Sequence, residues 1–296
     1  MRMDEESSPD IPVYRYFQSR GRECPQFDGS LWLIPYDGVM KTSVHPFTIQ
    51  WRHAVLLILV MGSLAFVWMQ APIRQDLAYH HFVDTRMLFG IPNFYNVISN
   101  LPFLFVGIAG LNFCRRQIFD FSKPAWTSFF LGLGLVSLGS AYYHLNPGNQ
   151  SLVWDRLPMT LGFMGLFAAL LGEFVHPNLS KHALIPLVLS GASSVLIWQW
   201  SDDLRFYAWI QFMPVLVIPF LLLLYPKQYS HSGFILLALL FYVLAKVLEA
   251  FDSPVFTLLH NEMAGHAIKH VFAAMGGLMI LCMLKIRTSS AIKVHD

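Results

Sequence analysis

Charged residues are scarce in this chain of 296 residues: Asp, Glu, Lys and Arg together make up only 13%. Soluble globular domains carry about 25%. The net charge is only +2, and the sequence contains no block of basic residues. A composition of this kind argues against an ordinary soluble protein, and nothing in it points to a nucleic-acid partner.

Cysteine is also scarce, with only Cys24, Cys114 and Cys282 and no paired spacing among them. This pattern excludes a disulfide framework and a thiolate metal site. Internal repeats and low-complexity segments are absent as well, and no feature marks a protein partner. The first apolar run begins near Ala54, too late for an ordinary signal peptide, so we expect it to remain as a membrane helix.

Hydrophobic residues, in contrast, make up 55% of the chain. Apolar runs approach the roughly 20 residues that cross a bilayer, and they recur along most of the sequence. We therefore predict an all-α polytopic membrane protein with eight spans, over residues 53–69, 92–112, 126–144, 158–175, 182–198, 206–225, 233–251 and 264–284. The predicted parts are a tail over 1–50, an extra transmembrane helix over 53–70, a seven-helix domain over 77–287 and a tail over 288–296.

The basic residues indicate how these spans are oriented, because Lys and Arg are enriched in cytoplasmic connections. One set of connections carries most of them, among them Arg115, Arg116, Lys181 and Lys285. We therefore expect both termini in the cytoplasm. The end of the 126–144 span and the start of the last span then lie toward the non-cytoplasmic side.

Three histidines are predicted to reach the same membrane depth. His266 and His270 are four residues apart, so their imidazoles lie on one helical face, and His144 ends an earlier span. Three neutral imidazoles with one open position are typical of a hydrolytic zinc site, where water is the fourth ligand. Bound Zn²⁺ lowers the pKa of that water to about 7. We predict that these three residues hold Zn²⁺.

Two further residues complete a hydrolytic site. Asp155 can accept the proton of the water as a general base and pass it to a leaving amine. Ser140 lies one turn before His144 and can donate a hydrogen bond to the carbonyl oxygen under attack. The set suits an amide or an ester, and a receptor-like or transport protein that binds metal structurally remains the alternative.

Polar residues inside two other spans also predict inward-facing surfaces. Asn93, Asn96 and Asn100 recur on one helical face. Lys246 and Glu249 can pair at i, i+3 within the 233–251 span, which favours a buried ion pair over a catalytic role. We expect Lys269 to extend toward the membrane surface.

The pattern Ser140-x3-His144, Asp155 and His266-x3-His270 resembles the alkaline ceramidases. These belong to an intramembrane hydrolase superfamily that includes the adiponectin-receptor-like proteins and GPI-remodelling lipid hydrolases. The segment over 93–100 is similar to a ceramidase segment ending in Asn-Thr-x-Ser-Asn. The resemblance covers about residues 80 to 285.

The resemblance implies a seven-helix intramembrane zinc amidase. It implies zinc ligation by His144, His266 and His270, water activation by Asp155 and carbonyl polarisation by Ser140. The implied substrate is ceramide or a related N-acyl lipid that reaches the site from the bilayer, giving a fatty acid and a long-chain amine. A lipid esterase or phospholipase of the same superfamily is the enzymatic alternative.

The sequence departs from the family at its calcium site, which is an acidic cluster before and at the start of the first core helix. Asn93 stands where the last acidic ligand is expected. The polar run around Asp84 lacks the Trp and Glu residues of that pattern. This difference argues against a calcium requirement.

Overall fold

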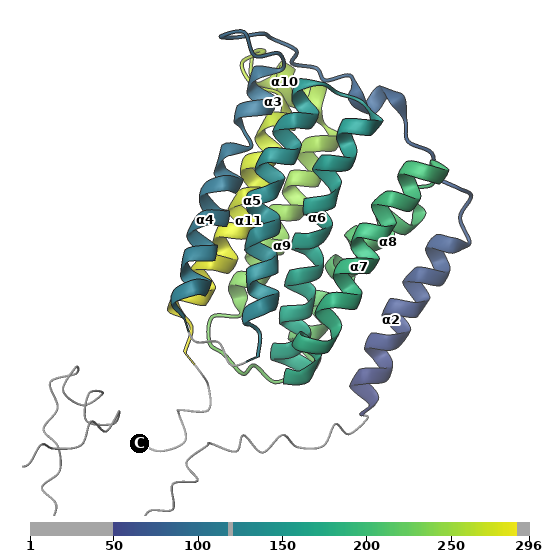
Figure 1. The fold of residues 1–296 in the computed structure, drawn as a ribbon, viewed down its shortest axis with the longest axis vertical. Helices are drawn as coiled ribbons and strands as arrows, with labels where there is room; N and C mark the ends of the chain where they lie inside the picture. Colours follow the sequence, from purple (N-terminus) through teal and green to yellow (C-terminus); the bar gives the residue numbers. More distant parts are fainter. Residues whose placement is uncertain (1–49, 118–120, 289–296) are drawn as a thin grey trace, which may run out of the picture. The chain divides into compact units, whose positions relative to one another are not determined.

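The structure is a computed structural model that describes residues 50–117 and 121–288 (Figure 1). Within these ranges it is helical without a β-strand, and eight helices are long and apolar enough to cross a membrane. The all-α polytopic fold with eight spans is thus confirmed. The predicted tails, 1–50 and 288–296, fall outside the described residues except for their innermost positions.

The spans are α2 (Trp51–Trp68), α3 with α4 (Phe94–Ile98 and Leu101–Arg116), α5 (Lys123–Leu145), α6 with the π-turn η2 (Asn149–Leu170 and Leu171–Val175), α7 (Pro177–Ser201), α8 (Arg205–Leu224), α9 (Gly233–Ala250) and α11 (Gly265–Ile286). Two short helices were not predicted. They are the 3₁₀ turn η1 (Leu77–His80) and α10 (Asp252–Leu258). Both lie at the end of the bundle where α5 ends and α11 begins.

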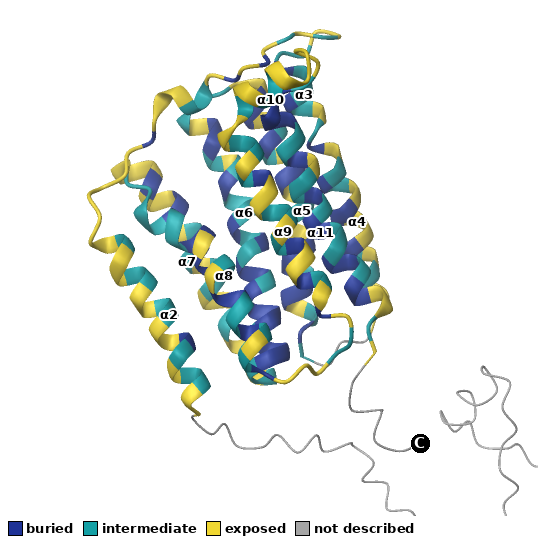
Figure 2. Ribbon diagram, turned by 180° about the vertical axis from the view of Figure 1, so that it is seen from behind, coloured by how far each residue is buried: buried dark blue, intermediate teal, exposed yellow. Residues whose placement is uncertain are grey.

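The additional N-terminal helix α2 lies against α8 and is mostly exposed (Figures 1 and 2). Polar contacts fix it there: Trp209 Nε1 donates to Ser63 Oγ at 3.1 Å, and Arg52 donates to the Leu224 carbonyl at 3.0 Å. An apolar helix so little covered by protein is suited to contact with lipid.

Glycines bring the central helices close together. A Cβ atom on Gly107 of α4 would lie 2.6 Å from Gly134 Cα of α5, and one on Gly132 would lie 2.4 Å from the Gly162 nitrogen of α6. Small residues at such crossings let helix backbones pack tightly in membranes. The inward faces of these helices are accordingly buried (Figure 2).

The predicted start of the fourth span was wrong. The span was predicted to begin at Pro158, whereas α6 begins at Asn149 and contains Pro158 in its interior. Asp155 therefore lies within a helix and not in the connection before it. Pro158 has no backbone N–H, so the Trp154 carbonyl four residues earlier lacks its usual helical donor.

The 92–112 span is divided at Asn100. Pro102 provides no N–H to continue the ladder, and the Asn100 side chain instead donates to the Asn96 carbonyl at 2.7 Å. Asn93, Asn96 and Asn100 are all buried, so the predicted inward-facing amide surface is present.

Candidate metal centre and active site

Three imidazoles meet at one end of the bundle. His144 comes from the last turn of α5, and His266 and His270 come from the first turns of α11. Their ring centroids are 5.0 Å apart for His144 with either partner and 5.3 Å apart between His266 and His270. The structure thus brings together three histidines that are more than 120 residues apart in the chain at the widest.

Neighbouring residues fix these histidines in place. Ser99 Oγ lies 2.8 Å from His270 Nδ1, and Asn93 Nδ2 donates to the His144 carbonyl at 2.8 Å. Asp252 of α10 accepts from the His266 backbone N–H at 2.7 Å. Such outer partners orient ligands and set the tautomer of a metal-binding histidine.

The side chains present fit a metal ion. One ligand atom from each histidine lies within 4.8 Å of the others, and all three residues are buried. His144 Nδ1 has no hydrogen-bond partner among the described residues, although a buried polar nitrogen without a partner is costly. Phe82 covers two of the rings, with centroids 4.7 Å from His144 and 4.8 Å from His266. Three imidazoles form a donor set that zinc favours.

Ser140 and Asp155 lie beside this cluster. Ser140 is buried on α5 and lies near Asp155 of α6. Ser140, Asp155 and His270 line the same cavity. Asp155, which is suited to move a proton, thus comes from α6, whereas the three histidines come from α5 and α11.

A close crossing of α5 and α6 positions the Ser140–Asp155 pair. A Cβ atom on Gly139 would lie 1.9 Å from the Trp154 carbonyl oxygen and 3.3 Å from the Asp155 nitrogen. Pro158 leaves this carbonyl without its helical N–H donor. Where α5 crosses α6, the Gly139 backbone therefore packs against a carbonyl oxygen that accepts no hydrogen bond within its own helix. Glycine at 139 is what allows Asp155 to approach Ser140.

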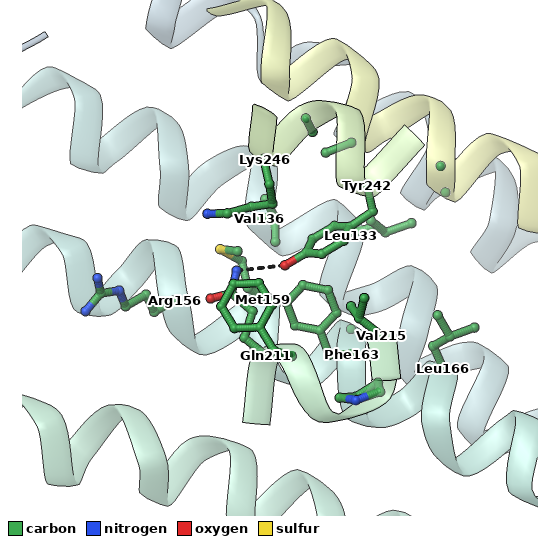
Figure 3. Close-up of a pocket in the computed structure, with 18 of the residues that line it drawn as sticks. Leu133, Val136, Arg156, Met159, Phe163, Leu166, Gln211, Val215, Tyr242 and Lys246 are labelled. Atoms are coloured by element: carbon green, nitrogen blue, oxygen red, sulfur yellow. Dashed lines mark hydrogen bonds between the residues drawn. The ribbon is translucent and has the colours of Figure 1, made fainter. Parts of the chain in front are cut away.

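A cavity of about 360 Å³ extends from these residues into the bundle (Figure 3). Its deeper walls are apolar and come from α5, α6, α8, α9 and α11, with Leu133, Phe163 and Leu166 among them. One polar contact crosses it, where Gln211 Nε2 donates to the Tyr242 hydroxyl at 2.9 Å. Such a shape accommodates a long apolar chain with a polar group at the histidine end.

An ion cluster lies on the α9 and α11 side of the cavity. Glu249 pairs with both Lys246 and Lys269, and it accepts a hydrogen bond from Tyr79 at 2.9 Å. The predicted Lys246–Glu249 pair is present. The expectation for Lys269 was wrong, because its side chain turns inward to Glu249 and does not extend to the membrane surface.

The connection before α3 is held by Arg86. Its guanidinium donates to both Asp84 carboxylate oxygens, at 2.8 and 2.7 Å, and to the Glu262 carbonyl at 2.6 Å. Burial raises the pKa of Asp84, but the hydrogen bonds from Arg86 outweigh it and hold that pKa below its usual value. Asp84 and Asn93 are thus engaged in contacts within the protein.

Sequence reasoning missed the partners of the histidines. Ser99, Asp252 and Phe82 lie on loops or helix ends, and nothing in their spacing relates them to His266 or His270. Only Asn93 belonged to a predicted inward face.

A protein-family model described as Ceramidase matches residues 81–294. The chain belongs to the ceramidase family. It is therefore an amide-bond hydrolase that acts on ceramide, as the resemblance implied. A comparison with curated proteins found no match. The matched range covers the spans from α3 to α11 and all five predicted site residues, while α2 lies before it.

Proposed function

We propose that this ceramidase is a zinc-dependent intramembrane amidase. In this proposal His144, His266 and His270 hold Zn²⁺, Asp155 is the general base and acid, and Ser140 binds the carbonyl oxygen. The observation that carries it is the cluster of three buried imidazoles beside the Ser140–Asp155 pair. Zinc in such a site makes hydroxide available near neutral pH.

The roles of the protein side chains follow from their positions. Asp155 takes a proton from the attacking water and gives it to the amide nitrogen as the C–N bond breaks, so the products are a fatty acid and a long-chain amine. Ser140 lines the same cavity as Asp155, so its O–H can point into the cavity and bind the substrate carbonyl. The apolar cavity excludes bulk water from both groups.

The lipid reaches the site from the bilayer in this proposal, between α8 and α9. These helices are consecutive in the chain, yet α9 packs mainly on α11 while α8 packs on α2, α6 and α7. Both helices line the cavity, and Phe212 of α8 contributes a side chain that is also exposed on the outside of the bundle. An acyl chain can thus enter sideways without passing through water.

We also propose the domain division and orientation derived above. Residues 77–287 form the hydrolase domain, α2 is an added span, and both termini lie in the cytoplasm with the histidine end toward the opposite side. The larger number of Lys and Arg residues in the connections at the opposite end supports this orientation. Labelling of single cysteines introduced at Asn149 and at Lys123 of the full chain in intact cells should modify only the former.

The zinc proposal is tested on the purified full-length protein with three variants. Wild-type protein should carry about one zinc per chain, and His270→Ala should lose it together with ceramide hydrolysis. His182→Ala, which alters an exposed histidine on α7, should keep both. Asp155→Asn should keep zinc and lose turnover.

The metal mechanism and the role of Asp155 would be contradicted by different outcomes. Full activity in zinc-free wild-type protein would exclude the metal mechanism, and turnover by Asp155→Asn would remove Asp155 from its role. A matched ester in place of the ceramide amide tests the esterase alternative. Faster cleavage of that ester than of ceramide would favour it.

A further inference from the structure

Two cationic side chains in the cavity have no task in the mechanism above. Lys246 comes from α9 and Arg156 from α6, and both line the cavity near its polar end. In Figure 3 both side chains extend to the same side of the Gln211–Tyr242 hydrogen bond. A charge within a membrane span costs several kcal/mol, so intramembrane cations are functional candidates by default.

Lys246 belongs to an ion cluster at the cavity that contains two lysines and one carboxylate. Glu249 is the one carboxylate that pairs with Lys246 in the described part of the chain, and it also pairs with Lys269. The Lys269 side chain is the more buried of the two lysines, with 15% exposed against 37% for Lys246. The Lys246, Lys269 and Glu249 cluster therefore has two cations for one carboxylate, and Lys246 is its more exposed cation at the cavity.

Arg156 is held rigidly without an acidic partner. Its guanidinium lies 4.0 Å from the Trp198 ring centroid and 4.7 Å from that of Tyr207, and Nη2 donates to Gln75 at 2.7 Å. Across the described residues Arg156 forms no ion pair, and Nη1 has no hydrogen-bond partner although the residue is only 6% exposed. A buried donor left without an acceptor is costly unless a ligand provides one.

We propose that Lys246 and Arg156 form a subsite for an anionic group on the lipid. The preferred substrates would then be N-acyl lipids that carry a phosphate, sulfonate or carboxylate close to the amide. This inference rests on the proposed function, because it requires the lipid amide to lie at Ser140 and Asp155. Guanidinium and ammonium groups are the usual partners of such anions.

The headgroup is a better occupant than the carboxylate of the product. In the proposed mechanism that carboxylate forms at the carbonyl carbon, beside Ser140 and the three histidines that would hold the metal. Lys246 lies on α9, which provides none of those residues. We therefore assign an anion bound at Lys246 to another part of the lipid, the substituent beside the amide nitrogen.

The test compares two lipids that differ only in charge. Full-length protein is assayed with N-palmitoylsphingosine and with its 1-phosphate in mixed detergent micelles. Wild-type kcat/KM should be roughly tenfold higher for the phosphate, the factor that corresponds to one charge-assisted hydrogen bond. Lys246→Met should remove that preference, Lys246→Arg should keep most of it, and the exposed control Lys181→Met should leave it unchanged.

Three other outcomes would contradict the subsite or its assignment to the headgroup. Equal or faster hydrolysis of the neutral lipid by wild-type protein overturns the subsite and leaves the proposed function standing. Hydrolysis of neither lipid overturns both. If Lys246→Met relieves inhibition by palmitate but leaves the lipid preference unchanged, the subsite holds the product carboxylate and the headgroup assignment is wrong.

Discussion

The contact between Gly139 and the Trp154 carbonyl makes ceramide hydrolysis sensitive to a single methyl group. Alanine at 139 would place Cβ 1.9 Å from that oxygen, whereas real Cβ atoms keep at least 3.0 Å. The backbone of α6 must therefore move away by at least about 1.1 Å, and the obstacle is backbone, which cannot rotate aside. Asp155 follows directly in the chain, so it moves away from Ser140 with it. A displacement of about 1 Å in a catalytic group costs on the order of 100-fold in rate.

The matched control is Gly134→Ala on the same helix. A Cβ atom there has its nearest neighbour at 3.9 Å, which is ordinary contact. Replacing glycine by alanine favours a helix by up to about 1 kcal/mol in both variants. A lower melting temperature of Gly139→Ala than of Gly134→Ala would therefore report the packing clash, separately from the loss of activity.

We expect Gly139→Ala to lose on the order of 100-fold in kcat/KM for ceramide. Its zinc should be retained, because His144 lies on α5 and the other two ligands on α11. Gly134→Ala should keep wild-type turnover, and activity of Gly139→Ala within threefold of wild type would refute this account of the α5–α6 crossing.

Three further predictions concern single side chains. Ser140→Ala should lower kcat about 10²–10³-fold with metal content unchanged, as measured by single-turnover hydrolysis. Hydrogen bonds from Arg205 lower the pKa of Asp203, so this carboxylate contributes stability above its unfolded pKa of about 3.9 and loses it as the pH falls through the lower folded pKa. Asp203→Asn should therefore lower the melting temperature at pH 7 and weaken its fall below pH 4. Glu173→Ala removes the carboxylate that accepts two 2.8 Å bonds from Arg287, and it should cost about 3–5 kcal/mol of stability in detergent without lowering turnover per folded molecule.

Periodicity and hydropathy were sufficient to predict the spans. Eight apolar stretches predicted eight helices, and the Asn93, Asn96 and Asn100 spacing predicted a buried face that the structure contains. The i, i+4 spacing of His266 and His270 predicted their shared face for the same reason. These features depend on local helix geometry, which a sequence encodes directly.

The remaining features depend on contacts between distant segments. Pro158 is compatible with a helix start or a helix interior, and the sequence around it does not distinguish the two. The Lys269 side chain can extend toward the membrane surface or turn into the bundle when α11 is considered alone. Its ion pair with Glu249 of α9 fixes the inward direction. Local propensity cannot resolve such cases, because tertiary packing overrides it.

The separate packing of α8 and α9 determines which ceramide concentration sets the rate of this enzyme. If lipid arrives between these helices, the relevant concentration is the mole fraction of ceramide in the surrounding leaflet and not its amount per volume. Diluting the membrane with an inert lipid should then slow turnover at constant total ceramide, whereas diluting the suspension with buffer should not. The rate would thus follow the composition of the membrane, and the two products would leave according to how each partitions between bilayer and water.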